Sequence, residues 1–133
     1  MPHHLLRPAL DQAASPDWST RVRAAEALAS HAADPHAAAA LHTLLLDSMD
    51  TAVPRRAAAA LWQEHSTAAL RLVAAALADA DETTADWILT GVHDALADND
   101  GDHGELTRRC AGLLRDSDAR VRGGAAELLK WLR

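Results

Sequence analysis

The single cysteine of this 133-residue chain, Cys110, is its most obvious candidate nucleophile. Without a second cysteine it can form no internal disulfide, and it gives no sign of an oxidising compartment. Cys110 lies at helical spacing from Leu106, Leu113 and Leu114, on an apolar stripe. We therefore expect a buried, unreactive thiol, and the serines, which mostly occupy turn positions, add no catalytic constellation.

Metal-binding chemistry is suggested by the segment 94–105, which carries five carboxylates. If Gly101 is placed at the sixth position of a twelve-residue calcium loop, the first and twelfth positions become Leu96 and Thr107. Neither residue is a charged ligand, so an acidic connector between two helices is the better interpretation. The eight histidines do not show the His-Glu-x-x-His spacing of a zinc site. We predict no metal and no cofactor, although whether 94–105 binds a metal stays open.

Composition limits the class of protein. The chain has 13 Lys and Arg against 19 Asp and Glu, a formal net charge of -6, which argues against nucleic-acid binding over a broad surface. Hydrophobic residues make up 49% but aromatic residues only 3%, which favours closely packed helices rich in Ala and Leu. We expect no membrane span and no signal peptide, hence a cytoplasmic protein, and the abundant Ala with a single Lys suggests a bacterial source.

A repeated helical element must position these side chains. Four segments begin with an aspartate and continue, three residues later, into an amphipathic run; their first residues, 33, 31 and 37 positions apart, are Asp17, Asp50, Asp81 and Asp118. Apolar residues recur in the first and last of these segments at the spacing of one helical face. We predict that each segment is a helix capped by its aspartate or a close neighbour.

A second helix is predicted after three of these segments, over 35–47, 66–79 and 104–116, each ending in its own aspartate. The head of the chain, at about 5–14, is predicted to be a lone helix closed by a turn at 15–17. The predicted layout is therefore one domain over 1–133, with an N-terminal capping helix in 1–16, helix pairs in 17–47, 50–79 and 81–116, and a C-terminal capping helix in 118–133.

The segment 118–129, Asp-Ala-Arg-Val-Arg-Gly-Gly-Ala-Ala-Glu-Leu-Leu, resembles the first-helix signature of HEAT repeats, especially the short bacterial repeats also found in phycobilin-lyase-like proteins. The segment 17–28 matches it nearly as well, whereas the Asp50 unit matches moderately and the Asp81 unit weakly. Tetratricopeptide and ankyrin arrays have similar periods, but their sequence patterns are absent. The resemblance implies an all-α fold, a right-handed α-solenoid of seven to eight helices, whose usual role is protein binding.

The resemblance also implies that second helices line the concave face. Residues opposite their packing stripe would form a shallow trough of small side chains edged by arginines. The predicted partner-binding residues are Thr43, Leu46, Arg71, Ala75, Arg108, Arg109 and Arg115. A partner helix or an acidic loop could lie there, held by bidentate arginine contacts, although an ordinary solvated face is the alternative.

Two further sets of residues have structural interpretations. The Asp and Arg residues of the repeat signature, such as Asp17 and Arg21, are expected to cap helices and to bridge neighbouring units. The four Trp residues are the only large rings, and we expect most of them to fill gaps between repeats. An exposed Trp would be a candidate binding anchor.

The sequence thus favours a protein-interaction module, such as an adaptor, an assembly factor or an inhibitor, over an enzyme. A subunit of a phycobilin-lyase-like enzyme and a nucleic-acid-binding HEAT-like protein are the alternatives. The oligomeric state and the partner stay open.

Overall fold

The computed structural model describes residues 6–98 and 103–132 and contains eight α-helices in those residues, with no strand among them. The helices are α1 (Arg7–Ala13), α2 (Trp18–Leu28), α3 (Pro35–Leu45), α4 (Ala52–Glu64), α5 (Thr67–Asp79), α6 (Glu82–Asp98), α7 (His103–Gly112) and α8 (Ala119–Leu132). Short 3-10 helices extend α2 as η2 (Ala29–His31) and α7 as η3 (Leu113–Arg115). The prediction of an all-helical chain with seven to eight helices is confirmed.

The repeated aspartates begin the helices that they were expected to begin. The carboxylates of Asp17 and Asp81 accept hydrogen bonds from the backbone N–H three residues later, at 2.9 and 2.7 Å. Those of Asp50 and Asp118 accept from the N–H two residues later, both at 2.9 Å. Each bond satisfies a donor that the first turn of a helix leaves without an intrahelical partner. The capping prediction is therefore confirmed.

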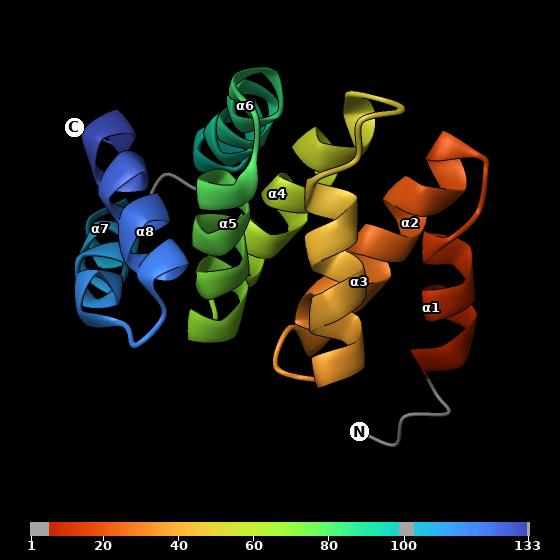
Figure 1. Ribbon diagram of the computed structural model, residues 1–133, viewed down its shortest axis with the longest axis horizontal. Coiled ribbons are helices and arrows are strands. Elements are labelled where there is room, and N and C mark those ends of the chain that lie inside the picture. The colour runs from red at the N-terminus through yellow and green to blue at the C-terminus, as the bar shows by residue number, and fades with distance from the viewer. Residues whose placement is uncertain (1–5, 99–102, 133) are drawn as a thin grey trace.

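The helices form two rows (Figure 1). The rear row contains α2, α4 and α6, with α4 packed between the other two. The front row contains α1, α3, α5 and α8 in this order, and α5 packs against both α3 and α8. Helix α7 lies behind α8 in this view and packs against it.

The position of α8 differs from the sequence-based expectation. In a regular repeat, α8, which resembles a first helix, would follow α6 in the row of first helices, and 104–116, a predicted second helix, would extend the row of second helices. Instead α8 packs along α5. Gly124 makes this contact possible, because a Cβ atom at this position would overlap the backbone carbonyl of Ala74. The α7–α8 pair is therefore inverted relative to the pairs before it.

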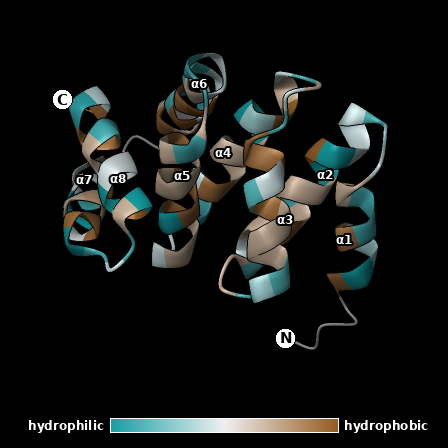
Figure 2. Cartoon of the chain, in the orientation of Figure 1, coloured by the Kyte–Doolittle hydropathy of each residue, from teal (hydrophilic) through white to brown (hydrophobic). Residues whose placement is uncertain are grey.

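The core between the rows is built from small and aliphatic side chains. Leu41, Leu61 and Leu70 are fully buried, as are many alanines, and Trp62 is the one fully buried ring among the described residues. Figure 2 shows hydrophobic residues concentrated where the helices face one another. Within the described ranges, no helix has both the length and the apolar character that crossing a bilayer requires.

Candidate interaction groove

A groove of about 850 Å³ is lined by α3, α5 and α8. We call it the α3–α5–α8 groove. Small and aliphatic side chains line most of it, among them Ala38, Ala39, Thr43, Ala68, Leu72 and Ala75. Its polar rim consists of His42, Arg71, Asp118 and Arg120. Of the seven predicted partner-binding residues, the structure brings three together here, Thr43, Arg71 and Ala75.

Arg71 connects α5 to the turn that precedes α8. Its Nε donates to Oδ1 of Asp116 at 2.8 Å, and its Nη2 donates to Oδ2 at 3.1 Å. This bidentate geometry is the strong form of an arginine–carboxylate pair. The hydrogen bond from Arg71 also lowers the pKa of Asp116 below its ordinary value. Arg71 therefore stabilises the groove as well as facing it.

Asp79 joins all three helices of the groove. Its Oδ2 accepts a hydrogen bond from Nη1 of Arg120 on α8 at 2.7 Å and lies 2.9 Å from Nε2 of His42 on α3. Nη2 of Arg120 also donates to Asp118 at 3.2 Å. Three carboxylates thus face the two arginines and the histidine of the rim. The rim has little excess positive charge, contrary to what a trough edged by arginines would have.

The other predicted residues lie elsewhere. On α7, Arg108 and Arg109 pair with Glu105 at 2.6 and 3.1 Å, and Arg109 also donates to the backbone carbonyl of His65. Arg115 is exposed in η3, and Leu46 is half-buried against the core at the end of α3. None of these four residues lines the groove. The three arginines lie away from Arg71 because α8, and not α7, packs along α5, whereas Leu46 packs against the core instead of facing the groove.

The sequence reasoning missed two groove residues as functional candidates, His42 and Arg120, together with Asp79, which contacts both of them. Asp79 was recognised only as the residue that closes a helix. Arg120 lies in the repeat signature of the last unit, which was expected on the opposite row. No local pattern indicates that these residues meet, since His42 and Arg120 lie 37 and 41 positions from Asp79 along the chain.

The Arg71–Asp116 pair predicts an acid-sensitive stability. Because the folded pKa of Asp116 is lowered from 3.8, the pair contributes fully above that value and loses its contribution as the pH falls through the lower, folded value. We expect Asp116→Asn to lower the unfolding free energy at neutral pH and to reduce its loss on acidification. Urea unfolding at several pH values measures both effects.

The matched variant for this test is Arg71→Gln, which removes the other partner. We expect the double variant to be little worse than either single variant, since the pair is broken once. Additive losses, or an acid sensitivity unchanged in Asp116→Asn, would contradict the assignment.

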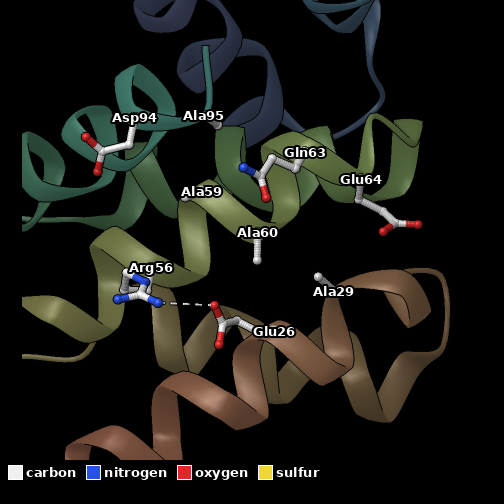
Figure 3. A pocket seen from close by; sticks show the side chains of 9 residues that line it. All are labelled: Glu26, Ala29, Arg56, Ala59, Ala60, Gln63, Glu64, Asp94 and Ala95. Carbon is white, nitrogen blue, oxygen red and sulfur yellow. Dashed lines mark hydrogen bonds and ion pairs between the residues drawn. The ribbon is translucent and has the colours of Figure 1, made fainter. Parts of the chain in front are cut away.

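A second groove, of about 500 Å³, lies on the rear row between α2, α4 and α6 (Figure 3). Its small lining residues are Ala29, Ala59, Ala60 and Ala95, and its polar ones are Glu26, Arg56, Gln63, Glu64 and Asp94. Arg56 points toward Glu26 in Figure 3, and the two form a salt bridge at 3.4 Å. Asp94 is held by Arg55 through bonds of 2.6 and 3.1 Å. These ion pairs connect neighbouring helices of the rear row, in agreement with the bridging role expected of the repeat arginines.

Cys110 is buried, as expected, and this burial raises the pKa of its thiol to about 11. Leu114, predicted to share its apolar stripe, is 42% exposed, so the predicted stripe was wrong at that position.

No cluster of three or more His, Cys, Asp or Glu suited to a metal ion occurs among the described residues. Asp100 and Asp102 of the acidic connector lie outside them.

No family model, curated protein or solved structure matches this chain.

Proposed function

We propose that this chain is a HEAT-like interaction module, not an enzyme, that binds a segment of another protein in the α3–α5–α8 groove. In this proposal it acts in the bacterial cytoplasm as an adaptor, an assembly factor or an inhibitor. The observation that carries the proposal is the groove itself, an open trough of about 850 Å³ lined by three helices.

The lining of the groove suits a helix or an extended segment. Ala39 and Thr43 are exposed on α3, and Ala68 and Leu72 are half-buried on α5. Small side chains let the backbone of a partner approach closely, and an amphipathic helix laid in a groove is a common mode of peptide recognition. We therefore expect the partner segment to present small or aliphatic side chains to the groove.

The charges of the rim refine the partner that the sequence suggested. Arg71 and Arg120 keep 43% and 52% of their side chains exposed, yet both are already bound by aspartates. Their remaining N–H groups can donate to single carbonyl or carboxylate oxygens of a partner. A strongly acidic segment would meet Asp79 and Asp118 at the same rim. Shape and apolar contact thus determine binding more than net charge does, which also makes nucleic acid a poor ligand.

The proposal is tested with Ala39→Trp, which fills the groove from an exposed position. The variant and the wild-type chain are used as baits in a lysate of the source organism, with quantitative mass spectrometry of the bound proteins. We expect at least one protein to be retained by the wild-type chain and reduced about tenfold or more by Ala39→Trp, because a large ring occludes the trough.

The control is Ala27→Trp, at an exposed position of α2 that lines neither groove described above. It carries the same change of residue on the other row, so its bound proteins should equal those of the wild-type chain. If every retained protein binds Ala39→Trp and the wild-type chain equally, the groove is not the binding site.

A further inference from the structure

The outer face of α6 lacks the neighbour that the repeat provides for α4. In the register of the repeat, Asp86 and Leu89 of α6 correspond to Arg55 and Ala58 of α4. Helix α6 packs on α4 at Arg55 and Ala58, against which Gly91 of α6 lies. Since α8 packs along α5, no first helix takes the equivalent place on α6.

This face borders two shallow cavities that meet end to end. One, of about 330 Å³, is lined by Asp86, Leu89, Thr90, His93 and Trp131. The other, of about 520 Å³, is lined by His93, Leu96, Ala97, Trp131 and Leu132. The α6 residues recur at the spacing of one helical stripe, the pattern of a helix that packs against another helix. Among the described helices, α8 reaches this face through Trp131. The ring of Trp131 lies edge-on to that of His93, with 5.8 Å between the ring centroids.

The order of a carboxylate acceptor and an imidazole donor along this stripe makes the stripe complementary to itself. Asp86 and His93 are exposed and lie seven residues apart. If two α6 helices pack antiparallel about an axis between Leu89 and Thr90, each Asp86 lies opposite the His93 of the other copy. Leu89 and Thr90 then meet at the centre. A two-fold interface requires this kind of reciprocal pairing.

We propose that the chain forms a two-fold dimer through the outer faces of α6, with Asp86 of each copy paired with His93 of the other. The opposite end of the rear row favours a closed pair over a head-to-tail chain of copies, because α1 packs over α2 there. The dimer leaves the α3–α5–α8 groove outside the interface, so this proposal does not depend on the proposed function.

Sedimentation equilibrium of the full chain tests the proposal at concentrations up to about 200 μM, which reveals a dissociation constant in the micromolar range. We expect a monomer–dimer equilibrium for the wild-type chain. Leu89→Asp should raise the dissociation constant about a hundredfold, since it places two carboxylates at the axis. Leu114→Asp, the same change at an exposed leucine of η3, should leave the equilibrium unchanged. A wild-type chain that stays monomeric, or that forms assemblies larger than dimers, would overturn the proposal.

Disulfide cross-linking tests the register with substitutions at exposed positions. Asp86→Cys and His93→Cys chains are mixed and treated with a mild oxidant; the native Cys110 is buried. We expect a covalent dimer that joins one chain of each kind. Each variant alone should cross-link far less, because identical positions lie about 10 Å apart along the paired helices. Equal cross-linking in the mixed and the separate samples would contradict the register even if the chain dimerises.

Discussion

Gly124→Ala is expected to lower the free energy of unfolding by about 3 kcal/mol, because the added Cβ forces α8 away from α5. A Cβ atom at this position would overlap the carbonyl of Ala74, which belongs to the backbone of α5, and the Cβ itself is fixed directly to the backbone of α8. The overlap cannot be relieved by turning a flexible side chain. Urea unfolding followed by circular dichroism measures the loss, and an altered near-ultraviolet signal would report the displaced Trp131.

Gly123→Ala provides the control one residue away on the same helix. A Cβ atom at Gly123 meets no atom within 4 Å. Alanine is the better helix former, so this variant should be more stable than the wild-type chain by about 0.5–1 kcal/mol. Equal effects of the two substitutions would show that α8 does not pack on α5 through Gly124.

Trp62→Ala is expected to cost about 4 kcal/mol, the typical loss when a large buried ring is removed from a core. Trp62 on α4 is completely buried in the hydrophobic core. Trp18→Ala, at a tryptophan that is 47% exposed, should change stability by less than about 1 kcal/mol. Thermal unfolding of both variants decides the comparison.

The variant Trp62→Phe separates the contribution of the aromatic ring to stability from the contribution of its N–H group. Within the described residues, the buried Nε1 of Trp62 has no hydrogen-bond partner, and such a group costs about 1–3 kcal/mol. Phenylalanine removes this cost together with part of the ring, so we expect a net loss below about 2 kcal/mol. A loss as large as that of Trp62→Ala would mean that the indole N–H is satisfied.

The helices themselves were accessible from the sequence because their signals are local. Asp17 and Asp81 cap helices at the positions where the repeat placed them. The predicted helix over 66–79 is α5 (Thr67–Asp79), with Ser66 accepting a hydrogen bond from the N–H of Ala69. Each of these features depends on residues within one turn of each other, so the repeat register sufficed to find them.

The packing of the α7–α8 pair could not be predicted from the sequence in the same way. The glycines of 118–129 contributed to the resemblance to a first helix, and the register then placed α8 after α6. Whether a glycine contacts α5 or α6 depends on residues about 50 positions away, and one sequence carries no record of that contact. Because α8 was placed wrongly, Arg71 lines the observed groove as predicted, whereas Arg108, Arg109 and Arg115 do not.

If a protein partner binds in the α3–α5–α8 groove, as we propose, it should protect the helices that line the groove from hydrogen exchange. The exchange is measured for the chain alone and for the chain saturated with a protein retained by the wild-type bait. We expect slower exchange in peptides covering 35–45, 67–79 and 119–132, with little change over 18–28 and 52–64. Slowed exchange confined to 18–28 and 52–64 would place the partner on the rear row and contradict the claim.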